Sequence, residues 1–286
     1  MEWLDCMKNA IEFIEAHIED RLDIKQVARI AASSVFHFQR MFSMLTDITV
    51  ADYIRKRRLT LAAQELAANK SRVINIAMKY GYETPESFAK AFKKLHGITP
   101  SQARLPGAQL VAFPKISFHI SIRGGRDMDY RIEQKQAFEV AGAIRSISTK
   151  DGANFKEVPA FWEDAAKDGT CEKVCAMAAG GNMYGICMDF EEDMSRFNYM
   201  IAADAPEGEL PAGMVKRQMP AATWAVFTSV GPLPEAIQKV TQSIFSEWFP
   251  STGYEHGNAP EIEVYFPGDT SCADYRCEVW IPVKKK

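Results

Sequence analysis

Acidic and aromatic side chains alternate in two short segments near the end of the 286-residue chain. Alternation along a strand would place Glu261, Glu263 and Tyr265 on one face, and Glu278 and Trp280 together on a face of a later strand. Carboxylates beside aromatic rings can bind a cation, because the carboxylate balances its charge and the ring faces attract it. The same alternation also fits the solvated face of a two-layer sheet, so the pattern alone leaves both interpretations open.

Basic side chains concentrate in the first third of the chain. Residues 21–106 contain fifteen Lys and Arg and six Asp and Glu, a net charge of +9, whereas the remainder carries −12. A basic module joined to an acidic one suggests that only the first meets a polyanion such as DNA. A solvated helical surface is the alternative on charge alone.

The basic module contains an internal repeat. Residues 27–49 recur at 76–99, and Phe38 and Phe42 match Phe88 and Phe92. In each copy a short helix, a tight turn and a second helix with apolar residues at helical spacing predict a helix-turn-helix unit. Between the copies, residues 50–68 form one long predicted helix. An α-helix fits the major groove of DNA, and a rigid connecting helix could hold two recognition helices about one duplex turn, roughly 34 Å, apart.

The second helix of each copy, the predicted recognition helix, begins after an N-cap residue, Ser34 or Thr84. The faces predicted to be exposed carry Phe36, Gln39 and Arg40 in the first copy and Glu86, Ser87 and Lys90 in the second. A helical bundle with an amphipathic surface is the alternative. It does not explain why Arg40 and Lys90 occupy matching positions.

Residues 3–104 resemble the DNA-binding domain of the AraC family of transcription regulators. The segments that carry the resemblance are Phe36–Phe42, Asp52–Leu59, Ile76–Tyr82, Ser87–Lys94 and Gly97–Ser101. The resemblance implies that the exposed residues of the first helix contact bases, that those of the second occupy the corresponding face, and that Ser34 and Thr84 contact phosphates. Ala32 departs from the family, which usually has Gly at this turn.

The segment Leu105-Pro106-Gly107-Ala108 contains the helix breakers Pro and Gly, and we expect the helical region to end there. We expect an all-α double helix-turn-helix domain at 1–106, a linker or strand region at 107–126, where 111–122 alternates like a strand, and an α+β domain at 127–286. The last shows a weak β-α-β-β duplication. Its first strand and helix fall at 138–142 and 155–167, and the second pair at 222–227 and 233–249.

The C-terminal region resembles the GyrI-like effector-binding domain. Pro260-x-x-Glu263-Val264-Tyr265, the segment Cys277–Val283 and Trp162 carry this resemblance. It implies a cavity between the two halves for a small amphipathic or cationic ligand, anchored by a carboxylate on the last strand. By position that anchor is Glu278, with Glu263 as second candidate. The candidate walls are Trp162, Tyr184, Trp248, Tyr265 and Trp280.

Together these features predict a ligand-responsive transcription regulator of the AraC type, with double-stranded DNA, a small effector and RNA polymerase as partners. They leave open whether it activates or represses its target genes. We expect no membrane span, because no apolar run approaches 18 residues, and no secretory signal. Six sparse cysteines indicate reduced thiols in the cytoplasm, without a metal or cofactor. Two alternatives remain: a GyrI-like hydrolase, in which Glu278 with Tyr184 or Tyr265 activates water, and a protein-docking module fused to the DNA-binding head.

Overall fold

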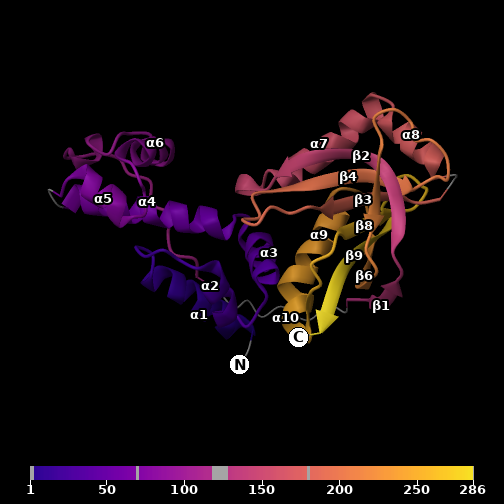
Figure 1. Cartoon of the computed structure of the whole chain (residues 1–286), viewed down its shortest axis with the longest axis horizontal. Helices are drawn as coiled ribbons and strands as arrows, with labels where there is room; N and C mark the ends of the chain where they lie inside the picture. Colours follow the sequence, from indigo (N-terminus) through magenta and orange to yellow (C-terminus); the bar gives the residue numbers. More distant parts are fainter. Residues whose placement is uncertain (1–2, 69–70, 118–127, 179–180, 286) are drawn as a thin grey trace. The chain divides into compact units, whose positions relative to one another are not determined.

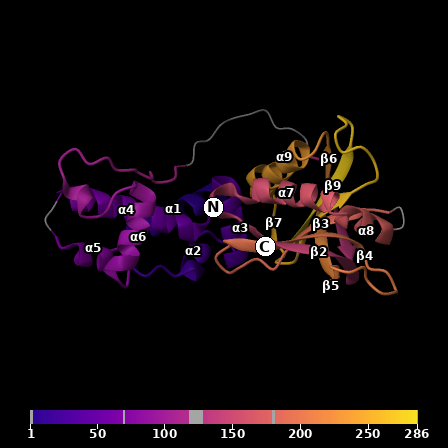
Figure 2. The same ribbon diagram turned by 90° about the horizontal axis from the view of Figure 1, so that it is seen from above.

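The computed structural model describes residues 3–68, 71–117, 128–178 and 181–285 (Figures 1 and 2). The chain forms two compact units. The first comprises Met1–Val35 and Val50–Ile122, and the second comprises Phe36–Thr49 and Arg123–Lys286. The first predicted recognition helix therefore belongs, from Phe36 onward, to the same unit as the C-terminal sheet.

The first unit is helical. Its elements are α1 (Trp3–Ala16), α2 (Ile24–Ile30), α4 (Val50–Ala68), α5 (Val73–Lys79), α6 (Pro85–His96) and the 3₁₀ turn η1 (Gln102–Arg104). The predicted long helix at 50–68 is confirmed as α4. Leu59, Leu66, Ile76, Phe88 and Phe92 pack into one core that joins α4, α5 and α6, so the apolar face of the second repeat copy is buried as its spacing predicted.

The turn before α6 follows from its residue types. Thr84 is the N-cap, and its hydroxyl accepts a hydrogen bond of 3.1 Å from the Ser87 backbone N–H, with Pro85 in the first turn. Gly81 has a φ of 80°, and a Cβ there would lie 2.7 Å from the Arg58 guanidinium. In the first copy Ala32 adopts a similar left-handed φ of 49°, at a cost of about 1 kcal/mol.

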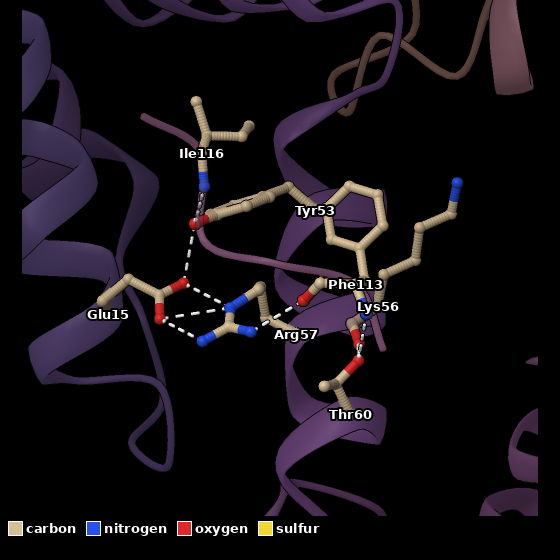
Figure 3. Close-up of polar contacts among 7 residues, drawn as sticks. All are labelled: Glu15, Tyr53, Lys56, Arg57, Thr60, Phe113 and Ile116. Atoms are coloured by element: carbon tan, nitrogen blue, oxygen red, sulfur yellow. Dashed lines mark hydrogen bonds and ion pairs between the residues drawn. The ribbon is translucent and has the colours of Figure 1, made fainter. Parts of the chain in front are cut away.

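Residues 111–117 form no strand, so the expectation from their alternation is wrong there; residues 118–122 lie outside the described residues. Side chains of α4 bind this backbone instead (Figure 3). The Phe113 N–H donates to the Thr60 hydroxyl at 2.9 Å, and its carbonyl accepts from Arg57 at 2.7 Å. The Ile116 N–H donates to the Tyr53 hydroxyl at 3.3 Å. These bonds fix the exit of the chain from the helical module.

The second unit is built on an antiparallel sheet. Its strands are β1 (Tyr130–Lys135), β2 (Phe138–Ser148), β3 (Met183–Met188), β4 (Arg196–Asp204), β5 (Val215–Met219), β6 (Ala222–Val230), β7 (Tyr254–His256), β8 (Glu261–Tyr265) and β9 (Arg276–Lys285). The described strands follow the order β1-β6-β9-β8-β3-β4-β2-β5, and β7 pairs with β9. The two predicted halves meet at the β3–β8 ladder.

Helices cover one face of this sheet. They are α7 (Asn154–Lys167), α8 (Thr170–Met177) and α9 (Glu235–Ser243), which continues through the π-helical turn η3 (Ile244–Trp248) into α10 (Phe249–Ser251). The two helices α7 and α8 contact β2, and α9 contacts β6 and β9. The 3₁₀ turn η2 (Lys150–Gly152) precedes α7, and α3 (Val35–Thr46) completes the unit from Phe36 onward. The predicted β-α-β-β duplication is confirmed, although sequence analysis missed α8.

The two faces of the sheet differ because neighbouring residues alternate between them. On β4, Tyr199 and Ile201 pack toward α7 and α8, whereas Met200 and Ala202 join a second core with Trp224 of β6. This second core also includes Met219 of β5. The helix-bearing face keeps room between α7 and α9.

Replacing Arg57 by Ala should lower the free energy of unfolding by about 2 kcal/mol. Arg57 donates to the Glu15 carboxylate at 2.9 and 2.8 Å and to the Phe113 carbonyl (Figure 3), and both members of the pair are mostly buried. Urea unfolding measures the change. The matched control is Arg55→Ala, because the Arg55 side chain is 40% exposed where it pairs with Asp52 and should contribute less than about 1 kcal/mol. Equal losses for both variants would contradict this assignment.

Candidate functional site

A cavity of about 750 Å³ lies on the helix-bearing face of the second unit. Its walls come from both halves of the duplication: α7 on one side, α9 on the other, and β3, β4, β8 and β9 beneath. The side chains that matter for its chemistry are Arg40, Trp162, Cys187, Tyr199, Glu261, Glu263 and Tyr265. Apart from these groups, the lining is mostly apolar.

Glu263 lies half-buried in the wall of the cavity between two phenols. Its carboxylate accepts hydrogen bonds from the Tyr199 hydroxyl at 2.5 Å and the Tyr265 hydroxyl at 2.8 Å. Trp162 extends the chain by donating its indole N–H to the Tyr199 oxygen at 3.0 Å. Burial raises the pKa of Glu263, although the two phenols oppose that effect. Burial also raises the pKa of both phenols, so they stay protonated donors.

Gly185 makes this arrangement possible. It lies opposite Glu263 in the β3–β8 ladder. A Cβ at this position would lie 2.6 Å from a Glu263 carboxylate oxygen and closer still to the Tyr199 hydroxyl. Any other residue would therefore force the carboxylate and its phenol apart. The absence of a side chain on β3 sets the position of the charged group on β8.

A second carboxylate, Glu261, lies two residues away on the same face of β8. It forms a bidentate ion pair with Arg40 of α3, with N···O distances of 2.7 and 2.6 Å. The His256 Nε2 also lies 3.1 Å from it. Burial alone would raise the pKa of Glu261, but the charge of Arg40 and the hydrogen bonds from His256 and Arg40 lower it to about 2. Glu261 is therefore ionised, in contrast to the raised pKa of its neighbour Glu263.

His256 supports this pair as a neutral ring. Burial lowers its pKa, and the field of Glu261 does not overcome that effect. The Asn258 backbone N–H donates to Nδ1 at 3.0 Å, which leaves the proton on Nε2 for Glu261. Glu261 thus receives donors from two directions, as a buried carboxylate requires.

The prediction that the polar face of the first recognition helix is exposed is wrong in this structure. Gln39 and Arg40 are only 6% and 8% exposed. The Arg40 guanidinium lies over the rings of Phe190 and Phe245, 5.1 and 5.2 Å from their centroids. Phe36 is half-buried, with its ring edge-on to Phe190. The physical reason is the buried Glu261, a charge partner that the sequence pattern of α3 could not reveal.

The second recognition helix has the predicted exposure. Thr84, Glu86, Ser87 and Lys90 are all exposed on α6 or at its start. Ser34, half-buried, immediately precedes α3. The two copies therefore differ: one presents its polar face to solvent, while the other turns that face toward the sheet of its own unit.

Three of the seven predicted ligand residues line the cavity: Trp162, Glu263 and Tyr265. Glu278 and Trp280 lie on the opposite face of the sheet, which corrects the expectation that Glu278 anchors a ligand there. The register explains this placement, because Glu278 pairs with Val264 and Trp280 with Ile262. Directly paired residues share a face, and Glu263 projects to the other one.

The remaining predicted wall residues have structural partners outside the cavity. Glu278 accepts from Arg131 at 2.8 Å and from the Trp280 indole at 2.8 Å. The Tyr184 hydroxyl donates to Asp204 at 3.1 Å. Trp248 is buried, and its ring stacks on Tyr254 with centroids 5.7 Å apart. Tyr199 was not predicted, although its alternation on β4 is a signal in the sequence. The pairing of Arg40 with Glu261 has no local signal in the sequence.

The fold and site define a DNA-binding regulator with a cavity-bearing sensor domain. Residues 27–105 match a helix-turn-helix domain family, and residues 131–283 match the family described as integron-associated effector binding protein. The chain belongs to this effector-binding family and, through its helix-turn-helix region, to the AraC-type regulators.

Individual relatives agree with this assignment. The transcriptional activator AarP of Providencia stuartii is 39% identical over 93 residues, which cover 32% of this chain and 69% of AarP. The Right origin-binding protein of Escherichia coli is 23% identical over the whole length of both chains. The solved structure of SAV2435 bound to tetraphenylphosphonium, 21% identical, shares the fold of the C-terminal region with a TM-score of 0.50, covering 55% of this chain and 94% of that one.

None of the helices in the described ranges has the length and apolar character needed to cross a membrane.

Removing one phenol should shift the titration of Glu263 further. In Tyr265→Phe the carboxylate loses a donor that stabilises its charged form, so its pKa should rise above the already raised wild-type value. NMR titration of the labelled Glu263 side chain measures this pKa. Tyr184→Phe is the matched control, because its hydroxyl bonds Asp204 on the other face. An unchanged Glu263 titration in Tyr265→Phe would refute the role given to this phenol.

Proposed function

We propose that this DNA-binding regulator uses its C-terminal cavity to bind a lipophilic organic cation, and that binding changes its action at a promoter. The observation that carries the proposal is Glu263. It is a half-buried carboxylate in a mostly apolar cavity, it receives only neutral donors, and within the described residues it forms no ion pair. Burying such a group without a counter-charge is costly, so a cationic guest would relieve an existing penalty.

The shape of the wall supports an organic cation rather than a bare ion. Trp162 and Tyr265 pack edge to face, with ring centroids 5.1 Å apart, beside the carboxylate. Aromatic faces attract a diffuse positive charge and cover its apolar substituents. The tetraphenylphosphonium complex of the structural neighbour SAV2435 gives a suitable probe of this chemistry.

The DNA-binding half uses the exposed face of α6 and, when it is available, the corresponding face of α3. We assign base contacts to Phe36, Gln39 and Arg40 and to Glu86, Ser87 and Lys90, with Ser34 and Thr84 near phosphates. The relative AarP is named an activator. We therefore assign activation to this chain, with RNA polymerase as its partner on the promoter and the cytoplasm, where that DNA lies, as its place of action.

The hydrolase alternative is less well supported. Glu278 is already bound by Arg131 and Trp280 and lies on the face opposite Tyr265. The phenols that do touch a cavity carboxylate have raised pKa values and are poor bases. The protein-docking alternative has no specific contact in its favour.

Glu263→Gln should weaken binding of tetraphenylphosphonium at least about tenfold, because the counter-charge is lost while the size of the side chain is kept. Isothermal titration calorimetry on the full chain measures the affinity. Glu278→Gln removes a carboxylate from the opposite face and should leave the affinity within about twofold. If both variants bind like the wild type, the cavity does not recognise cations through Glu263.

Lys90→Ala should weaken binding to a selected DNA site by about 1–3 kcal/mol, a loss of about fivefold to 150-fold, if Lys90 contacts a base edge. The assay is a fluorescence-anisotropy titration of the full chain on a duplex enriched by in vitro selection. Lys173→Ala, an exposed residue on α8, makes the same charge change outside the DNA-binding half. If both variants lose similar DNA affinity, the effect of Lys90→Ala reflects the net charge of the protein and not a base contact.

A further inference from the structure

Arg40 has two roles that exclude each other, a base contact and an ion pair with Glu261. Arg40 is assigned above to a base contact from α3, yet here its Nε and Nη2 donors are both bound by Glu261 in the cavity. An arginine contacts guanine through the same fork of donors. The guanidinium cannot engage Glu261 and a base at the same time, so the ion pair excludes base contact by Arg40.

The contact that holds Arg40 is strong. Both charged groups are buried, and the guanidinium lies over the Phe190 and Phe245 rings. His37 lies three residues before Arg40 on α3, and its Nδ1 accepts a hydrogen bond of 3.1 Å from the His256 backbone N–H. Removing one partner of such a buried pair leaves an uncompensated charge and is strongly destabilising. The face of α3 that carries Arg40 is therefore held by an ion pair as well as by apolar packing.

Arg40 also borders the site proposed for the guest. Glu261 and Glu263 lie on the same face of β8, two residues apart, and both line the cavity together with Arg40. A second cation beside Glu263 would repel the guanidinium and compete for Glu261. The cavity therefore already holds a cation of the protein itself, the Arg40 guanidinium, bound to Glu261.

We propose that Arg40 acts as an internal guest of the effector cavity, holding α3 away from DNA until an organic cation displaces it from Glu261. The displaced α3 then contributes its base contacts. The displacement step rests on the proposed function, because it requires a cationic ligand in the cavity. The holding step does not need one and can be tested without any ligand.

Glu261→Gln in the full chain, without ligand, should bind the selected DNA duplex at least about tenfold more tightly than the wild type, because the buried anchor of Arg40 is lost. Glu278→Gln, whose carboxylate pairs with Arg131 on the opposite face, should bind like the wild type. Equal DNA affinity of Glu261→Gln and wild type, with both folded by circular dichroism, would overturn the proposal.

A second variant protects the test against a folding defect of Glu261→Gln. Phe190→Ala removes a ring that contacts Arg40 and Phe36 but leaves both carboxylates in place. It should also tighten DNA binding, by a smaller factor. In the double variant Arg40→Ala, Phe190→Ala the gain should disappear, because no guanidinium is released; a gain that persists would contradict the role of Arg40.

Ligand linkage separates this proposal from the proposed function. Saturating tetraphenylphosphonium should tighten DNA binding of the wild type, and DNA should tighten tetraphenylphosphonium binding by the same factor. Glu261→Gln should lose most of this coupling. If tetraphenylphosphonium does not bind at all, the cation assignment fails, while a tighter complex of ligand-free Glu261→Gln with DNA still supports the holding step. Binding of the cation without any coupling overturns the displacement step alone.

Discussion

Two carboxylates on one face of one strand, the buried Glu261 and the half-buried Glu263, are the constraint on which the second unit depends. Burial disfavours the charged form of each carboxylate, but the two carboxylates have different partners. Glu261 keeps its charge because Arg40 and His256 surround it, and its pKa falls to about 2. Glu263 has only neutral phenols, and its pKa is raised. The difference arises from partners on other elements, since both side chains leave the same face of β8.

Packing around these charges follows from that constraint. A carboxylate can approach the Tyr199 phenol only where β3 carries no side chain, which places Gly185 opposite Glu263. The helices α7 and α9 stand apart above β8, so the cavity lies between the halves of the duplication. The opposite face is filled by a continuous apolar core, which gives the strand that carries the charges a rigid support.

Local patterns in the sequence predicted most of the elements. Helical spacing and capping residues identified α4 and the start of α6, and alternation placed Glu261, Glu263 and Tyr265 on one face of β8. The resemblance to the GyrI-like domain pointed to Glu278 as the anchor, but the register between β8 and β9, which no local pattern reveals, puts Glu278 on the other face. Helical spacing also predicted Arg40 at the surface. Helical periodicity identifies the face of a helix, but a buried charge partner 221 residues away is set by tertiary structure.

The long separation between Arg40 and Glu261 also has a consequence for biosynthesis. The α3 helix leaves the ribosome early, whereas β8 emerges only when most of the chain has been made. At translation rates of about 5–20 residues per second, this interval lasts roughly 10–40 s. During that time the guanidinium has no carboxylate on β8 to receive it, so the ion pair between Arg40 and Glu261 can form only after β8 has been made.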